Sequence, residues 1–272
     1  MGKNYKDCSQ LQESIVKGGR AGFNSVMYLS NTHRVIATRD GYGDVDIKVK
    51  YINHSRFEKL SLLFGKTPFI RGVWVLLDGF VIAWKLSIVI LLLVIINLFL
   101  LNGLVYDKSS EGIGNIYTSV ISDFRINFIL ILAILLICAF LNKFTELGKF
   151  HSAEHMVDNA YVASKNLNLS SVLKYSRIHQ SCGTNLMVFI LLFYLLFIFI
   201  TDDFMVSIFL SYILGYEVYM IKNPIIKYLL KPFYLIGYLI QYHIFTSVPE
   251  KKHLEVAVVA YKTLLDESRK NL

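Results

Sequence analysis

The stretch KFHSAEHMVD, residues 149–158, decides how the rest of the chain is interpreted. On a helix, residues three and four apart share one face, so His151, Glu154 and His155 would point in the same direction. The spacing H-x-x-E-H is that of inverted zinc peptidases, in which two imidazoles hold Zn²⁺ and the glutamate acts as a base. The stretch therefore predicts a helix that carries half of a metal site.

A second stretch further along the chain, SRIHQSCGT at residues 176–184, supplies His179 and Cys182. A thiolate beside an imidazole suits Zn²⁺ better than Mg²⁺ or Ca²⁺. Neither stretch is specific by itself, because a single His or Cys is more often a packed or solvated residue. The chain has only seven His and three Cys, however, and three of these His and one Cys fall within residues 151–182. The sequence predicts a zinc site with the ligands His151, His155, His179 and Cys182.

The composition predicts an integral membrane protein. Hydrophobic residues make up 54% of the 272 residues, and they occur in long blocks. We expect a mainly α-helical membrane protein with four transmembrane helices, a small N-terminal β-sheet, and cytoplasmic or interfacial helices. Each predicted span approaches the roughly 20 apolar residues that cross a bilayer. The spans are residues 86–105, 126–141, 186–200 and 204–221.

The basic residues predict an orientation. All but two of the 28 Lys and Arg would lie on one side of these spans, the exceptions being Lys108 and Arg125. Both termini and the metal-site loop should then face the cytoplasm, in a multi-pass protein of a bacterial inner membrane. No apolar leader follows Met1, so the first span would direct insertion. Anionic lipids account for the net charge of +8, and we expect as partners membrane lipids and either a second copy or another membrane protein. No motif indicates nucleic-acid binding.

The regions around the spans divide the chain further. Short runs rich in β-branched and aromatic residues predict strands at 22–29, 33–39 and 45–52. The last two alternate apolar with polar residues and are separated by a turn at 40–43. An apolar stripe from Leu254 to Leu265 predicts a C-terminal helix with one face buried on this sheet. The expected parts are a flexible N-terminus (1–17), a cytoplasmic β-rich domain (18–66), a membrane domain (67–245) with a metal-site loop (142–185) and interfacial helices at 68–84 and 225–245, and a cytoplasmic C-terminal helix (246–272).

Two features allow more than one interpretation. The pair Gly18 and Gly19 either reverses the chain before the sheet or brings its backbone close to a ligand or to the His/Cys loop. Glu217 lies near the cytoplasmic end of the last predicted span, where an ionisable residue either extends to the boundary or faces a partner or cavity.

Several short motifs occur together in one order: GGRA (18–21), KTPFIRG (66–72), HSAEH (151–155), SRIH (176–179), CGT (182–184), YE (216–217), Gln241, Thr246 with Pro249, and EVA (255–257). In this order the chain resembles the bacterial YqhQ-like membrane proteins, a domain of unknown function described as a predicted metal-dependent enzyme. The resemblance implies the metal site and the four-span layout, and supplies no substrate. The chain departs from the family pattern at Arg20 and Asn24, where a Gln and a Glu are expected. If that Glu has a role at the site, this member lacks it.

Two functions are compatible with these residues. The first is a Zn²⁺-dependent hydrolase that acts at the cytoplasmic leaflet on a lipid-linked or peptide substrate, with Glu154 or Glu217 as general base. The second is a closed, structural His/Cys zinc site in a scaffold, assembly factor or transporter component. A channel or carrier with Glu217 on its pathway ranks behind both, because the predicted spans otherwise lack charged residues. The coordination number of the metal distinguishes the first two.

Overall fold

The computed structural model describes residues 15–52, 64–82, 88, 92, 137, 140–141, 143–201 and 203–270. The chain forms two compact units. The first, called here the sheet unit, comprises Met1–Asn53, Ala139–Gln180 and Tyr238–Leu272; the second, the helical unit, comprises His54–Cys138 and Ser181–Gly237.

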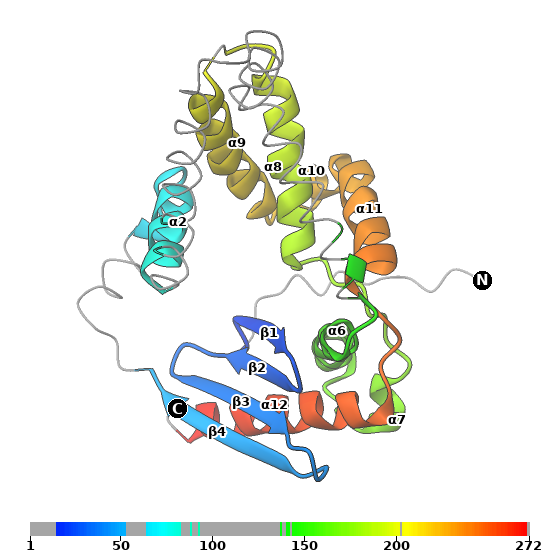
Figure 1. The fold of residues 1–272 in the computed structure, drawn as a ribbon. Helices are drawn as coiled ribbons and strands as arrows, with labels where there is room; N and C mark the ends of the chain where they lie inside the picture. The colour runs from blue at the N-terminus through cyan, green and yellow to red at the C-terminus, as the bar shows by residue number, and fades with distance from the viewer. Residues whose placement is uncertain are drawn as a thin grey trace, which may run out of the picture. The chain divides into compact units, whose positions relative to one another are not determined.

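The sheet unit contains a four-stranded antiparallel sheet whose strands follow one another in chain order (Figure 1). Short connections favour this arrangement, since consecutive antiparallel strands can be joined by tight turns. The turn between the first two strands places Asn24 at a φ of 54°, a left-handed conformation that asparagine tolerates. The strands predicted at 33–39 and 45–52 are confirmed to within one residue, whereas the single strand predicted at 22–29 is wrong, because a turn at residues 23–24 divides it between two strands. The four strands are β1 (Gly18–Gly22), β2 (Ser25–Leu29), β3 (His33–Arg39) and β4 (Val45–Tyr51).

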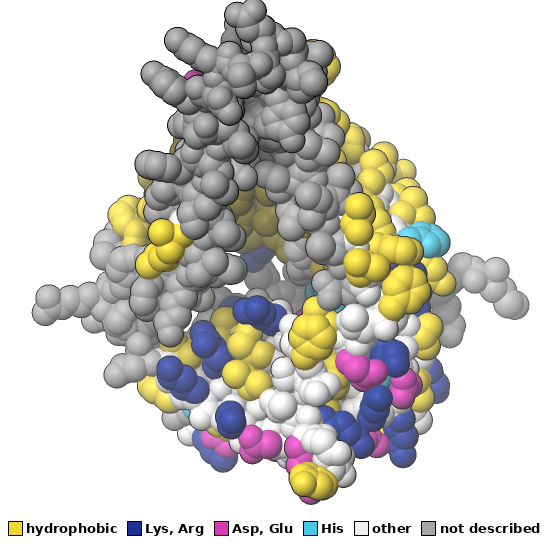
Figure 2. All heavy atoms as spheres, in the orientation of Figure 1, with side chains coloured by type: hydrophobic (Ala, Val, Ile, Leu, Met, Phe, Trp, Pro, Cys, Tyr) yellow, Lys and Arg dark blue, Asp and Glu magenta, His cyan; other side chains and the backbone are white. Residues whose placement is uncertain are grey.

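Two long helices, α6 (Glu146–Ser164) and α12 (Lys251–Arg269), pack on one face of this sheet, and the short α7 (Leu169–Val172) lies against both (Figure 1). The ring of Tyr28 on β2 meets the ring of Tyr261 on α12 edge to face, with centroids 4.8 Å apart. Leu254 and Leu264 are fully buried, which confirms the predicted buried stripe of the C-terminal helix. On the face drawn in Figure 2, basic and acidic side chains are interspersed over the sheet unit.

A fully buried histidine joins the beginnings of α6 and α12. The Nε2 of His253 lies 2.6 Å from Oε2 of Glu146, and its Nδ1 accepts a hydrogen bond from the backbone N of Glu250 at 3.1 Å. Burial alone would raise the pKa of Glu146, but hydrogen bonds from His253, Lys149 and Lys252 outweigh it and lower this pKa to about 2. The carboxylate form of Glu146 therefore stabilises the junction of the two helices.

This carboxylate predicts a loss of stability in acid. Because the folded-state pKa lies below the usual 4.5, the stabilisation is complete above about pH 5 and is lost as the pH falls towards 2. We expect Glu146→Gln to lower the melting temperature near neutral pH, and the difference from the wild type to shrink between about pH 4.5 and 2. Thermal unfolding across this range measures it, with Asp266→Asn, which removes an exposed carboxylate from α12, as the control. A difference that is unchanged down to pH 2 would contradict the assignment.

The helical unit contains five described helices: α2 (Ile70–Ile82), α8 (Gly183–Phe197), α9 (Phe204–Tyr219), α10 (Pro224–Leu229) and α11 (Lys231–Ile240), the last of which continues into the next segment of the sheet unit. Helices α8 and α9 pack closely at Gly215, where an added Cβ would lie only 2.8 Å from the backbone N of Ile190. Helix α9 begins where the Asp203 side chain accepts a hydrogen bond from the backbone N of Val206 at 3.0 Å. The two helices predicted at 68–84 and 225–245 correspond to α2 and to a broken series, α10, α11 and the π-helix η1 (Gln241–Phe245).

The structure corrects the membrane prediction. Among the described residues, none of the helices combines the length and the apolar composition that crossing a bilayer requires. Helices α8 and α9 have 15 and 16 residues, and at 1.5 Å per residue they extend about 22 and 24 Å, against roughly 30 Å of hydrocarbon. Helices α6 and α12 have 19 residues each but carry many charges. The predicted four-span membrane fold and the multi-pass inner-membrane location are therefore wrong for the described residues. The predicted spans at 86–105 and 126–141 lie outside them, apart from residues 88, 92, 137, 140 and 141.

Candidate metal centre

Helix α6 carries the stretch with which the sequence analysis begins, and the predicted common face is present. The ring centroids of His151 and His155 are 4.4 Å apart. The ring of His179, from the segment that follows α7, stacks on His155 with a centroid distance of 5.4 Å. The two sequence stretches therefore converge, and three of the seven histidines form one cluster in the sheet unit.

Backbone carbonyls orient two of these imidazoles. The Nδ1 of His155 lies 2.7 Å from the carbonyl oxygen of Arg177, and the Nδ1 of His151 lies 3.3 Å from that of Phe245. A carbonyl oxygen can only accept, so in each ring Nδ1 carries the proton and, in the neutral ring, Nε2 carries the lone pair. This is the arrangement typical of histidines that bind metals through Nε2.

The third imidazole is held by a carboxylate. The Nε2 of His179 lies 2.9 Å from Oδ2 of Asp158, whose Oδ1 accepts a hydrogen bond from the hydroxyl of Tyr261 at 2.8 Å. Burial lowers the pKa of His179, but the hydrogen bond to Asp158 and the charges of Asp158 and Glu154 outweigh it, so the net shift is upwards. Asp158 thus fixes the ring of His179, while Tyr261 fixes Asp158.

The remaining ionisable groups are shifted mainly by burial. Burial lowers the pKa of His151, and it lowers that of His155 further with the help of the neighbouring rings. Near neutral pH these two imidazoles are uncharged, which is the form that binds metals. Burial also raises the pKa of Glu154 to about 8. The charge of His179 lowers this pKa, and the charge of Asp158 raises it. Oε2 of Glu154 lies 3.5 Å from Nε2 of His155, beside the nitrogen that carries the lone pair.

Strand β1 makes room for the Glu154 carboxylate. A Cβ added to Gly19 would stand 2.1 Å from Oε1 of Glu154, whereas one added to Gly18 would meet no atom of the described residues within 4 Å. The hydroxyl of Tyr28 donates to the backbone oxygen of Glu154 at 3.0 Å, which fixes this turn of α6 against the sheet. Of the two interpretations of the glycine pair, the close backbone approach is therefore the one that applies at Gly19.

Three residues could hold a metal ion. Among the described residues, ligand atoms of His151, His155 and Cys182 all lie within 4.8 Å of one another. Two imidazole nitrogens and one thiolate fit Zn²⁺, which binds nitrogen and sulfur in tetrahedral sites. Cys182 is buried, and its Sγ lies 3.3 Å from Oγ1 of Thr184. His179 belongs to the same histidine cluster but not to this group of three, since Asp158 holds its Nε2.

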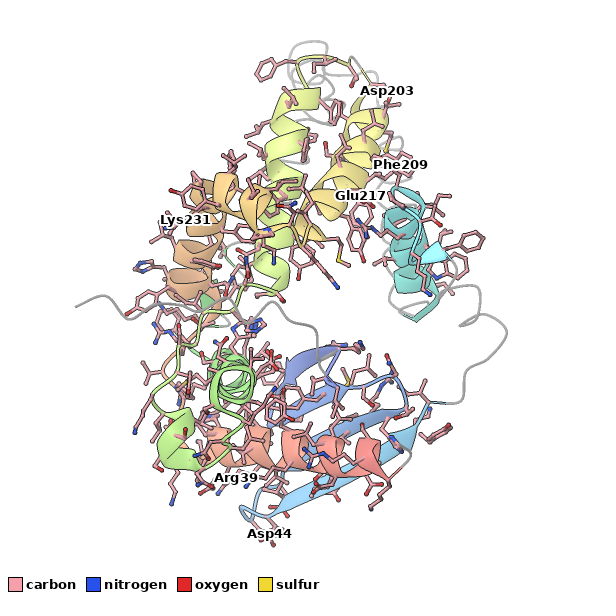
Figure 3. All side chains as sticks on the ribbon, turned by 180° about the vertical axis from the view of Figure 1, so that it is seen from behind. Arg39, Asp44, Asp203, Phe209, Glu217 and Lys231 are labelled. Carbon is pink, nitrogen blue, oxygen red and sulfur yellow. The ribbon has the colours of Figure 1, made fainter. Side chains whose placement is uncertain are left out.

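The other predicted catalytic residue, Glu217, lies on α9 in the helical unit (Figure 3). Its Oε1 accepts hydrogen bonds from Nε of Arg71 and from the backbone N of Phe69, both at 2.9 Å, and Arg71 makes a second contact with Oε2. Burial would raise the pKa of Glu217, but these contacts outweigh it and the net shift is downwards. The carboxylate therefore faces a partner, and it fixes the beginning of α2, where Phe69 has a φ of 65°.

Sequence reasoning missed three residues of the site: Asp158, Tyr261 and Gln241. Asp158 follows His151 by seven residues, which is helical spacing, so it could have been found on the same face. For Tyr261, the sequence indicated only a place in the apolar stripe of its helix. Gln241 is fully buried and its Oε1 accepts a hydrogen bond from the backbone N of His179 at 3.0 Å. Its only signal was its place among the motifs shared with the YqhQ-like proteins.

Comparison with known proteins identifies a family. The family model described as "Protein of unknown function (DUF1385)" matches residues 79–267, which include the whole histidine cluster and Cys182. Neither the curated proteins nor the solved structures gave a match. The family match agrees with the resemblance found in the sequence. It covers more than half of the chain, and the protein therefore belongs to the DUF1385 family of proteins of unknown function.

Proposed function

We propose that the protein is a zinc-dependent hydrolase in which His151, His155 and Cys182 bind the metal and Glu154 is the general base. The observation that carries the proposal is the 3.5 Å distance between Oε2 of Glu154 and Nε2 of His155. This places a carboxylate beside the metal-facing atom of a ligand, where a general base for a metal-bound water is needed.

Each residue of the proposed site has a separate role. When bound, Zn²⁺ supplies a water whose pKa is lowered to about 7. In its carboxylate form, Glu154 would accept a proton from that water, and the close approach of Gly19 keeps the carboxyl group in place. The carbonyls of Arg177 and Phe245 hold the two imidazoles in the tautomer that binds through Nε2. His151, His155 and Cys182 would hold the ion, and three protein ligands are the number that catalytic zinc sites use.

A structural zinc site is the second candidate, and one observation favours it. The ring of His179 stacks on His155 at 5.4 Å, which places a third imidazole beside the pair for a closed shell of three His and one Cys. In that case Asp158 would orient a fourth ligand, and the protein would be a scaffold without an open position on the metal.

Glu154→Gln separates the two candidates, because it keeps the shape of the side chain and removes its capacity to accept a proton. As a base, Glu154 is dispensable for the metal, so the variant should keep its zinc and melting temperature and lose hydrolysis of a panel of aryl esters, phosphodiesters and peptides. Elemental analysis, thermal unfolding and the panel measure this. The control, Asp266→Asn, removes an exposed carboxylate outside the site and should keep zinc, melting temperature and turnover.

Other results contradict the proposal. A fall of zinc content and melting temperature together in Glu154→Gln would make Glu154 a ligand or a structural partner. A wild-type protein with one zinc per chain and no metal-dependent hydrolysis would favour the structural site. A wild-type protein that binds no zinc would contradict both candidates.

A further inference from the structure

Gln241 holds a defined orientation beside the histidine cluster. It is fully buried, and its Oε1 accepts a hydrogen bond from the backbone N of His179 at 3.0 Å. An N–H can donate only to the oxygen of the side-chain amide, so this contact settles which end of the amide faces His179. The Nε2 atom, which carries two hydrogens, belongs to the same amide group and therefore also lies close to the segment that contains His179.

The Nε2 of Gln241 is a buried donor that no acceptor within the described part of the chain satisfies. The other groups of the residue are satisfied: its carbonyl oxygen accepts from the backbone N and from Oγ1 of Thr246, at 2.9 and 2.7 Å. Leaving a buried donor without an acceptor costs about 1–3 kcal/mol, so such groups are rare and call for an explanation. Both oxygens of the residue are hydrogen-bonded within the fold, which points to a ligand as the acceptor for Nε2.

The backbone around Gln241 ties it to the metal centre. Gln241 begins the π-helix η1, and Phe245, whose carbonyl oxygen orients the ring of His151, ends it. The two ends of this one turn thus contact two different histidines, His179 through the amide and His151 through the carbonyl. Single π-helical turns are rare and occur often at functional sites, because they change the direction of side chains locally.

We infer that the amide NH₂ of Gln241 donates a hydrogen bond to an oxygen of the substrate bound at the metal centre. This inference rests on the proposed function and adds a substrate-binding residue to it. An uncharged, buried N–H donor selects an oxygen acceptor, either the carbonyl or carboxylate oxygen of an acyl compound or a phosphoryl oxygen. During hydrolysis negative charge develops on such an oxygen, and a fixed donor stabilises it.

The test uses the full-length chain loaded with Co²⁺, whose absorption reports ligands that bind the metal, and two probes, acetate and inorganic phosphate. Gln241→Glu keeps an acceptor for the backbone N of His179 and, in its carboxylate form, removes the donor. Gln241→Met removes both the acceptor and the donor without adding charge. We expect both variants to keep Co²⁺ and to bind the probe about tenfold more weakly than the wild type. The probe that binds the wild type more tightly assigns the acyl or the phosphoryl class.

Unchanged probe binding in both variants would overturn the inference. Weaker binding in Gln241→Glu alone would also overturn it, because the added negative charge would then explain the loss. If Gln241→Met fails to fold, the side-chain NH₂ resonances of Gln241 in the ¹⁵N-labelled wild type decide: a shift on addition of the probe supports the inference, and no shift contradicts it. A wild type that binds no Co²⁺ contradicts the proposed function, and the same NMR titration of the metal-free protein then decides the inference separately.

Discussion

His155→Ala should abolish metal binding. His155 is the central ring of the cluster, in contact with the rings of both His151 and His179. Its removal leaves at most two of the three proposed ligands, and two bonds do not offset the loss of metal hydration. We expect the zinc content to fall from about one per chain to less than a tenth of that, as measured by elemental analysis and by titration with Co²⁺.

Two further variants make this result specific. His243→Ala removes an exposed imidazole from η1 and should leave the zinc content unchanged. If His179 is not a ligand, His179→Ala should weaken zinc binding less than His155→Ala does. If His179 is the fourth ligand of a structural site, the two variants should lose zinc equally. Full zinc content in His155→Ala would mean that the cluster does not bind the metal, and the proposed function would fail.

Gly19→Ala should displace the Glu154 carboxylate, whereas Gly18→Ala should not. Neither glycine has a positive φ, so alanine is acceptable to the backbone at both positions. The two positions differ in the space around the new Cβ. It would be 2.1 Å from Oε1 of Glu154 at position 19, and at position 18 it would contact none of the residues that the structure describes. We expect Gly19→Ala to lower the free energy of unfolding by about 1–3 kcal/mol and to abolish hydrolysis while zinc is retained.

Chemical denaturation, elemental analysis and the hydrolysis panel measure these effects. The double variant Gly19→Ala with Glu154→Ala should recover most of the lost stability, because the colliding atoms are gone, and this coupling identifies Glu154 as the partner. Equal stability and activity in the Gly18 and Gly19 variants would show that β1 does not position the carboxylate.

Local periodicity explains what could be predicted from the sequence. The common face of His151, Glu154 and His155 follows from helical spacing alone, and strand β3 follows from alternation between turn residues. The membrane prediction failed because the length of an apolar run does not say where a helix ends. The run predicted as the third span ends its helix at Phe197, and the next helix begins only after Asp203 caps it.

The rest of the site depends on contacts between segments that are distant in sequence. Gln241 is 62 residues from His179, and the hydroxyl of Tyr261 reaches Asp158 across 103 residues. Such pairs produce no periodic pattern in the sequence, since each residue is compatible with its own helix whether or not its partner is present. Asp158 is the exception, because it shares the helical face of His151 and could have been assigned from spacing.

The hydrogen bond from Tyr261 to Asp158 also has a consequence for biosynthesis. During translation, every residue of the histidine cluster leaves the ribosome before α12, the helix that carries Tyr261. Until that helix docks, Asp158 lacks the donor to its Oδ1, and the sheet lacks the ring that packs on Tyr28. A nascent chain that ends before α12 therefore contains every proposed ligand without the framework that aligns them. Loading of the proposed metal should accordingly be a late step, coupled to the folding of α12 rather than to the synthesis of the ligands.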